Sequence, residues 1–138
     1  MAAAGSAVER NQELVRSFVE TLSSGDLGRL APLFHEDAVW TVCATGIPGA
    51  GSHPGRRVIL EEFLGPVRGM FQPGEPKLEI TNVVANDRWV AFEATGRGSF
   101  RSGTPYENHY SFWLELDGGI VRTLREYMDS QYVATLAP

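Results

Sequence analysis

The stretch PYENHYSFWLELDGGIVRTLREYMD, residues 105–129, decides how the rest of the chain folds. Two runs rich in aromatic and β-branched residues flank the sequence DGG at 117–119, a pattern typical of two antiparallel strands joined by a tight turn. We expect a three-residue loop whose last glycine adopts a positive φ and forms a bulge, which pairs Leu116 with Ile120. Because side chains alternate along a strand, this pairing determines which of them share a face.

One face of the predicted hairpin is mostly apolar, and we interpret it as the inner face. It carries Asn108, Tyr110, Phe112, Leu114, Leu116, Ile120, Leu124, Glu126 and Met128. In this register Tyr110 lies directly opposite Glu126, so a phenol and a carboxylate are expected to meet inside the protein, far from the turn. Arg122 is the exception, and it sits near the turn, where the end of the sheet lets its charged head reach water.

The length and composition indicate an ordinary globular chain. Its 138 residues predict a single domain over 1–138, with residues 1–7 frayed. A net charge of −5 without a basic stripe argues against nucleic acid as a partner. The single cysteine, Cys43, excludes an internal disulfide. No apolar run reaches the roughly 20 residues of a membrane span, and the first residues do not resemble a signal peptide, so we expect no membrane partner and a cytoplasmic location.

The first half of the chain is predicted to be helical. Apolar residues at helical spacing predict a first helix over 8–23, which Gly25 ends. Asp26 is expected to cap a second, short helix, and Pro32 makes that helix irregular. A third helix is predicted over 57–70.

The second half is predicted to form strands. Residues 38–42 favour a first short strand, and the segment 45–55, rich in glycine and proline, favours a loop. Further along, the apolar spacing changes to period two, which predicts strands over 78–85 and 89–98 before the hairpin. Helices followed by a run of antiparallel strands are typical of an α+β fold, in which one face of the sheet packs on the helices.

Four segments resemble the nuclear transport factor 2-like superfamily and, within it, the branch of SnoaL-like polyketide cyclases, ketosteroid isomerases and limonene epoxide hydrolases. They are ETLSSGDLGRLAPLFHEDAVW at 20–40, GRRVILEEF at 55–63, VAFEATG at 90–96 and the hairpin at 105–129. The resemblance implies a cone-shaped, curved antiparallel β-sheet packed on three N-terminal helices, also described as a cystatin-like α+β barrel. It further implies a ligand pocket at the open end of the cone and, often, a homodimer that pairs through the outer face of the sheet. This fold carries isomerases, cyclases, hydrolases and non-catalytic binders.

Taken position by position, the resemblance carries over little of the family's catalytic machinery. The carboxylate on the last strand of the epoxide hydrolases corresponds to Glu126, whereas their arginine and second aspartate fall on Glu93 and Thr95. The base of the isomerases falls near Val42 and their oxyanion-hole tyrosine falls on Phe18, and neither side chain exchanges a proton.

A candidate site follows from the alternation along residues 89–98, which places Glu93, Thr95 and Arg97 on one face. If that face looks inward, the pocket contains Trp40, Glu93, Thr95, Arg97, Asn108, Tyr110, Glu126 and Met128. Two carboxylates close together in an apolar cavity give one protonated and one ionised group near pH 7, which suits acid/base catalysis. We predict Glu126, Tyr110 and Glu93 as catalytic residues. We predict Trp40, Thr95, Arg97, Asn108, Met128 and His53 as substrate-binding residues.

Each of these assignments has a structural alternative. Glu93 and Arg97 can form a buried ion pair without a catalytic role. Tyr110 can be a core tyrosine bonded to its neighbours. His53 can gate the pocket or shuttle protons, or it can be an ordinary solvated loop histidine. No two histidines share metal-ligand spacing, and Cys43 stands alone, so we expect neither a metal nor another cofactor.

Two functions fit this reading. The first is a cofactor-independent enzyme that uses acid/base chemistry for isomerisation, cyclisation or epoxide opening of a hydrophobic polyketide-, terpenoid- or steroid-like substrate. The second is a non-catalytic protein that binds a hydrophobic small molecule. On the outer face, Trp113, Val121 and Tyr127 predict an apolar patch, which we expect a homodimer to cover.

Overall fold

The structure of the protein, a computed structural model, describes residues 6–136. Its elements in chain order are α1 (Ala7–Ser24), α2 (Leu27–Leu30), η1 (Ala31–Leu33), β1 (Phe34–Val42), β2 (Gly51–Pro54), η2 (Val58–Leu64), α3 (Gly65–Arg68), β3 (Lys77–Ala85), β4 (Trp89–Ser99), β5 (Pro105–Asp117), β6 (Ile120–Met128) and α4 (Ser130–Leu136). The helices pack on a curved six-stranded sheet that does not close on itself, which confirms the predicted α+β class. None of the helices in this described range has the length and apolarity needed to cross a membrane.

Helix α1 begins and ends where its sequence predicts. The side chain of Ser6 accepts a hydrogen bond from the backbone N–H of Glu9 at 3.1 Å, which is the usual N-cap interaction. Gly25 ends the helix with a φ of 77°, a left-handed conformation that favours glycine. Ser6 and Ala7 thus form the start of α1, and residues 1–5 lie outside the described part.

The segment expected to be a loop over 45–55 contains a short strand. Strand β2 pairs antiparallel with β1, with His53 opposite Trp40 and Ser52 opposite Thr41. The two hydroxyls of Ser52 and Thr41 lie 2.9 Å apart. The prediction was wrong at residues 51–54 because the edge of β1 carries backbone donors and acceptors that need partners, whatever the local composition.

The third predicted helix is present, and its middle is π-helical. The backbone N–H of Gly65 bonds to the carbonyl of Leu60, five residues earlier. This wider turn directly precedes Pro66, which lies in the first turn of α3, where a missing N–H is tolerated. The helix therefore accommodates the proline and continues to Arg68.

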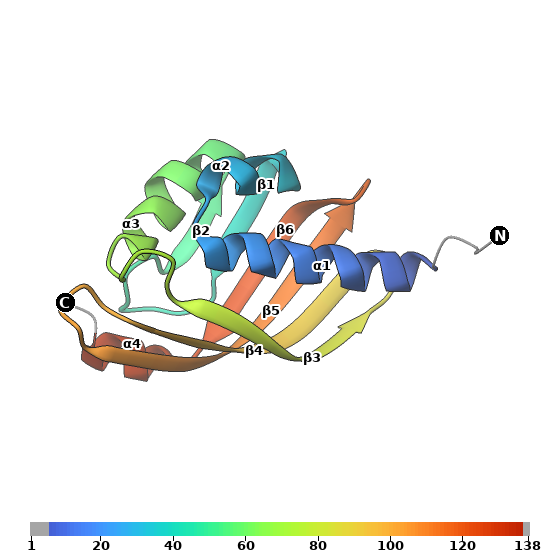
Figure 1. Cartoon of the computed structure of the whole chain (residues 1–138). Coiled ribbons are helices and arrows are strands. Elements are labelled where there is room, and N and C mark those ends of the chain that lie inside the picture. Colours follow the sequence, from blue (N-terminus) through green and yellow to red (C-terminus); the bar gives the residue numbers. More distant parts are fainter. Residues whose placement is uncertain (1–5, 137–138) are drawn as a thin grey trace.

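The sheet has the strand order β2-β1-β6-β5-β4-β3. Neighbouring strands are antiparallel except for β1 and β6, which run parallel. Figure 1 shows α1 lying across one face of the sheet, with α2 and α3 together at one end of it. The inner face of the sheet and α1 enclose the main hydrophobic core, which includes Phe18, Trp40, Phe92, Phe112 and Leu124.

The register of the β5–β6 hairpin differs from the prediction. Gly118 and Gly119 both have positive φ and form a two-residue turn, so Asp117 pairs with Ile120 and Leu116 with Val121. The extra residue sits in β6 instead, because the register shifts between Leu116–Val121 and Glu115–Thr123.

This bulge exchanges the faces of two neighbouring residues. Val121 is completely buried, whereas Arg122 reaches the surface and bonds to Asp117 at 2.9 Å. The expected position of Val121 on the outer face is therefore wrong. Beyond the bulge, Leu124, Glu126 and Met128 share the inner face with Phe112, as predicted.

The inward face proposed for β4 is also wrong. Val90, Phe92 and Ala94 are the buried apolar side chains of this strand, and they pair with Leu114, Phe112 and Tyr110 of β5. Burying each large apolar side chain stabilises the fold by about 1.5–3 kcal/mol, whereas burying a charged side chain carries a desolvation penalty. The charged residues of β4 therefore lie on the outer face.

Helix α4, which the sequence reading missed, packs against a second apolar cluster. Phe71, Phe100 and Tyr106 form the cluster, and Tyr132 and Val133 of α4 lie against it. In Figure 1 the helix lies at the lower left, near the turn between β4 and β5. This second cluster and the main core border the same internal cavity.

Candidate functional site

A cavity of about 100 Å³ lies between the main core and the second apolar cluster. Its lining is mostly aliphatic and aromatic and comes from α1, β1, η2, α3, β3, β5, β6, α4 and their connections. Four residues bring polar chemistry to this lining: Arg68, Tyr106, Tyr110 and Glu126. An apolar cavity with a few convergent polar groups is the usual form of a small-molecule site.

Glu126 is the carboxylate of the cavity. The indole Nε1–H of Trp40, on the neighbouring strand β1, donates a hydrogen bond to Glu126 Oε1 at 2.9 Å. Glu126 keeps some accessible surface because it lines the cavity, but apolar neighbours separate its carboxyl from bulk water. This burial raises the pKa of Glu126 from 4.5 to about 7, and the Trp40 hydrogen bond offsets part of the rise. Near neutral pH the group therefore exchanges a proton readily.

Tyr110 belongs to a chain of hydrogen bonds on the inner face of β5. Its hydroxyl lies 2.5 Å from the hydroxyl of Tyr106, which accepts a hydrogen bond from Asn108 Nδ2 at 3.1 Å. Burial raises the pKa of Tyr110 well above its ordinary value of 10, and burial also raises the pKa of Tyr106. Both phenols are therefore neutral at physiological pH, and either hydroxyl can donate the hydrogen bond that joins them.

The ring of Tyr110 has its place because Gly96 carries no side chain. A Cβ at Gly96 would come within 2.8 Å of the Tyr110 ring. The ring also stacks on Phe112, with centroids 5.4 Å apart. This packing holds the phenol in one orientation against the cavity.

The observed register places Tyr110 and Glu126 diagonally instead of face to face. Glu126 pairs with Phe112, and Tyr110 pairs with Met128. Diagonal neighbours across a sheet have Cα atoms roughly 7–8 Å apart, still within reach of long side chains. No hydrogen bond joins the two groups, so the expected direct contact of phenol and carboxylate is wrong. Both groups nevertheless line the same cavity.

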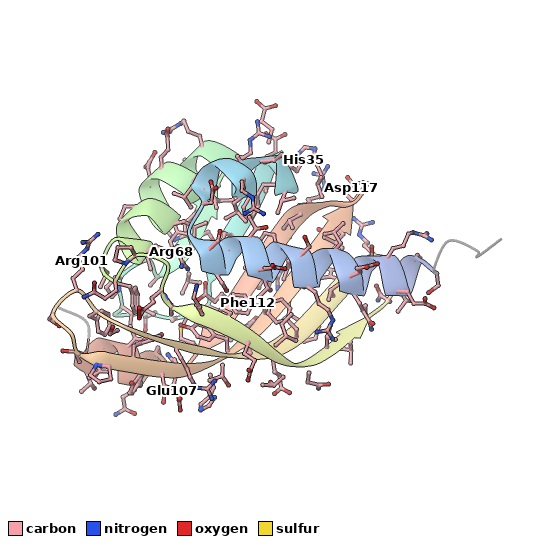
Figure 2. The ribbon with its side chains drawn as sticks, in the orientation of Figure 1. His35, Arg68, Arg101, Glu107, Phe112 and Asp117 are labelled. Carbon is pink, nitrogen blue, oxygen red and sulfur yellow. The ribbon has the colours of Figure 1, made fainter. Side chains whose placement is uncertain are left out.

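Arg68 contributes a positive charge to the same cavity. Its Nη2 donates to the backbone carbonyl of Ser23 at 3.1 Å and to that of Pro76 at 3.4 Å. Burial lowers the pKa of Arg68 below its usual range, and the guanidinium remains charged at neutral pH. Figure 2 shows Arg68 between the helices and the sheet, whereas Glu107 lies beneath the sheet on its outer side.

Three predicted site residues lie on the outer face instead of in the cavity. Glu93 is exposed, and its carboxylate lies 3.4 Å from Asn82 Nδ2. The guanidinium of Arg97 bonds to Glu107 at 2.7 Å, and the Thr95 hydroxyl lies 3.4 Å from His109 Nδ1. The expected convergence of Glu93 with Glu126 is wrong, because the apolar residues of β4 take the inner positions.

Four of the other predicted residues line the cavity, and the remaining two contact residues of its lining. Trp40, Tyr110, Glu126 and Met128 are brought together as expected. Asn108 is buried and supports Tyr106. The ring of His53 stacks on Phe63, a residue of the cavity wall, and its Nε2 lies 2.7 Å from the carbonyl of Gly49. His53 is thus half-buried in β2 and holds the adjoining loop.

The sequence reading missed Arg68 and Tyr106, although both carry a recognisable signal. Tyr106 continues the alternation of Asn108 and Tyr110 along the inner face of β5. Arg68 lies four residues after the buried Leu64, a spacing that places both on one helix face. A charged residue on an apolar helix face is informative because an unpaired charge is rarely buried without a role.

The open curved sheet, the covering helices and the internal cavity define an α+β cone protein of the nuclear transport factor 2-like fold. The chain belongs to the SnoaL-like domain family, whose model matches residues 15–123.

Solved structures share this fold. Bal32a, from a soil-derived mobile gene cassette, is 27% identical with a TM-score of 0.79, over 93% of this chain and 95% of that one. A limonene epoxide hydrolase-like epoxide hydrolase of M. tuberculosis is 17% identical with a TM-score of 0.75, over 93% and 89% of the two chains. TerC, crystallised with polyporic acid, is 17% identical with a TM-score of 0.81, over 93% and 97%. No curated protein matches the chain in sequence.

Proposed function

We propose that the protein is a cofactor-independent enzyme that moves a proton on a compact hydrophobic carbonyl compound, in an isomerisation or a cyclisation. The observation that carries this proposal is the Glu126 carboxyl, which lines an apolar cavity and has a pKa raised to about 7. General acid/base catalysis is most effective when the catalytic group has a pKa near the working pH.

Glu126 acts as the base and then as the acid. Its carboxylate removes a proton from a carbon next to the substrate carbonyl, and the electron pair of that C–H bond moves into the carbonyl to form an enolate. In an isomerisation, the resulting Glu126 carboxylic acid returns the proton to a different carbon of the same molecule, and the double bond moves. In a cyclisation, the enolate carbon instead attacks a second carbonyl carbon of the same molecule, and Glu126 gives its proton to the alkoxide oxygen that forms. Neither reaction consumes another reactant.

Tyr110 stabilises the oxygen on which negative charge develops. A neutral phenol is a hydrogen-bond donor, and a fixed donor in a dry site can lower the barrier for enolate formation. Tyr106 and Asn108 hold the hydroxyl of Tyr110 in place through their own hydrogen bonds. The diagonal register leaves room for substrate between this donor and the Glu126 base.

The cavity restricts the size of the substrate. Its volume of about 100 Å³ is below the roughly 300–1,000 Å³ of pockets for drug-sized ligands. An apolar cavity of about 150 Å³ holds benzene. A single ring or a short branched chain of terpenoid- or polyketide-like character therefore suits this site better than a fused steroid. The likeness in fold to TerC, which was crystallised with polyporic acid, supports a ligand-binding role for such a cavity.

Non-catalytic binding of a hydrophobic ligand is the second candidate. The observation that favours it is the hydrogen bond from Trp40, which gives the Glu126 carboxyl a partner without any substrate. Epoxide opening is a further candidate reaction at the same site, in keeping with the likeness in fold to the M. tuberculosis hydrolase. All three readings predict binding in the cavity, and they differ in turnover.

The test is an assay of wild type, Glu126→Gln and Glu93→Gln with three readouts. They are conversion of cyclohex-3-enone to cyclohex-2-enone, exchange of ketone α-protons in deuterated water, and hydrolysis of cyclohexene oxide. Glutamine keeps the acceptor for the Trp40 indole but carries no transferable acid proton. We expect the Glu126 variant to lose about 100-fold or more of the proton-transfer rate.

Glu93→Gln is the matched control, because Glu93 is a carboxylate on the outer face of the same sheet. It is expected to keep the wild-type rate. Equal turnover by wild type and Glu126→Gln would remove Glu126 from the mechanism. Binding of these small rings without turnover by the wild type would favour the non-catalytic reading, and epoxide hydrolysis alone would redirect the proposal to epoxide opening.

A further inference from the structure

Arg68 has hydrogen-bonding capacity that the protein does not use. Its two hydrogen bonds, to Ser23 and Pro76, both come from Nη2, and none is found for Nε or Nη1. Among the described residues, no enclosed side-chain nitrogen or oxygen lacks a partner. Nε and Nη1 are therefore not fully enclosed by protein, and Arg68 is a residue of the cavity lining.

The charge of Arg68 also lacks a carboxylate partner. Within residues 6–136 no carboxylate lies at ion-pair distance from its guanidinium, although Arg57, Arg88, Arg97 and Arg122 all form ion pairs. The two carbonyls that hold Arg68 are neutral, and that of Ser23 belongs to the C-terminal turn of α1. These contacts orient the guanidinium without neutralising it.

We infer that Arg68, together with Tyr110, forms an anion-binding end of the cavity that selects a compact apolar molecule carrying a carboxylate. This inference rests on the proposed role of the cavity as a ligand site, and it deepens that proposal by naming the charge of the ligand. The fork of a guanidinium matches the two oxygens of a carboxylate, and the phenol of Tyr110 adds a neutral donor nearby.

The two ends of the cavity then contact different parts of the ligand. Arg68 interacts electrostatically with Tyr110, and its charge opposes the rise in the pKa of that phenol. Glu126 is not among the groups that perturb Arg68, and it is held by Trp40 instead. A ligand whose carboxylate lies at Arg68 therefore presents its apolar part toward the acid/base group.

The experiment compares matched ligand pairs by NMR on ¹⁵N-labelled protein. The pairs are benzoate with benzamide, and cyclohexanecarboxylate with cyclohexanecarboxamide, which have nearly the same shape and differ in charge. The indole N–H of Trp40 reports occupancy of the cavity, and the Nε–H of Arg68 reports contact with the ligand. Measuring at about pH 6, below the pKa of Glu126, keeps that carboxyl mostly protonated.

We expect the wild type to bind each carboxylate about 10- to 100-fold more tightly than its amide, as a hydrogen-bonded charge pair predicts. The Arg68 Nε–H signal should shift with the carboxylates only. Arg68→Gln should abolish the preference, and Arg68→Lys should keep a weaker one, because lysine retains the charge and loses the fork. Arg57→Gln, which removes an exposed arginine of the preceding turns, should change nothing.

Three results would overturn the inference. If acid and amide bind the wild type equally, the cavity has no anion-binding end, and the proposed function stands without it. If the preference survives Arg68→Gln, another group provides it. If neither compound perturbs Trp40, the cavity takes no ligand of this size, and the proposed function falls with the inference. Should Arg68→Gln fail to fold, the lysine variant and the wild-type Nε–H signal still decide.

Discussion

Glu126 and Glu115 belong to the same hairpin and experience opposite environments. Glu126 lies on the inner face, where burial raises its pKa to about 7. Glu115 lies on the outer face, where hydrogen bonds from Arg88 at 2.6 Å and Thr123 at 2.9 Å lower its pKa. The residue type is the same, so the surroundings alone determine whether the carboxyl favours or resists its charge.

The difference shows that the two faces of the sheet give the same side chain different pKa values. On the outer face, Glu107 and Glu115 have arginine partners and access to water, so their charges are compensated. On the inner face, Glu126 has one neutral donor and no cation partner, so its charge is costly and its proton is easily exchanged. The hairpin thus carries a carboxyl with a raised pKa on its inner face and one with a lowered pKa on its outer face.

The largest effect is expected from removing a ring on the inner face. Phe112 is 2% exposed and contacts the rings of Trp40, Phe92 and Tyr110. Phe112→Ala should lower the free energy of unfolding by about 3–5 kcal/mol, because it removes buried surface and leaves a cavity. Urea denaturation measures this, and a loss below about 1 kcal/mol would show that the inner face is loosely packed.

The next effect depends on pH and distinguishes the two carboxylates. The folded-state pKa of Glu126 lies above its unfolded value, so the folded protein binds the extra proton and its stability falls as pH rises from about 4.5 to about 7. At pH 8, Glu126→Gln should therefore be more stable than wild type by about 3 kcal/mol, and the two should converge below pH 4.5.

Glu115→Gln is the control, because its expected effect on folding stability has the opposite sign. Its folded-state pKa is depressed, so its contribution is present at neutral pH and is lost as pH falls through the acid range. The variant should lose less than about 1 kcal/mol at pH 7, because Arg88 is 64% exposed and the ion pair is screened. Urea titrations of both variants over this pH range test the pair, and a stabilising effect of Glu115→Gln at pH 7 would contradict the comparison.

The smallest effect on folding is expected on the outer face. Trp113 and Tyr127 are 46% and 41% exposed, and Val84 is 59% exposed in the same row of the sheet as Trp113. We propose that this patch pairs two copies of the chain. Trp113→Asp should then convert a dimer to a monomer in sedimentation velocity at micromolar concentration, with a change of roughly 0.5 kcal/mol or less in monomer stability. A monomeric wild type would contradict the pairing.

Local patterns were enough to predict most of the elements. The spacing of Val15, Phe18, Val19 and Leu22 predicts one buried side of α1, and all four are buried. Gly25 ends the helix and Asp26 caps the next, as their backbone and hydrogen-bonding preferences require. These features depend on neighbours a few residues away, which the sequence displays directly.

Features that depend on distant partners were predicted less well. A single extra residue at Arg122 changed the register of the hairpin and exchanged the faces of two residues. The orientation of β4 was misjudged because its charged residues alternate as regularly as its apolar ones. Strand β2 and helix α4 escaped prediction because their short, mixed sequences gain stability from the strand and the apolar cluster that they contact.

The sequence by itself determined the α+β class, the amphipathic helix α1 and the inner positions of Tyr110 and Glu126, because periodicity and turn chemistry are local properties. Only the tertiary structure decided that Glu93 faces outward and that Arg68 and Tyr106 join the cavity. It also decided that Glu126 is far enough from water to hold its proton near neutral pH. The reason is physical: desolvation, register and the meeting of side chains from distant elements are properties of packing, which no short stretch of sequence contains.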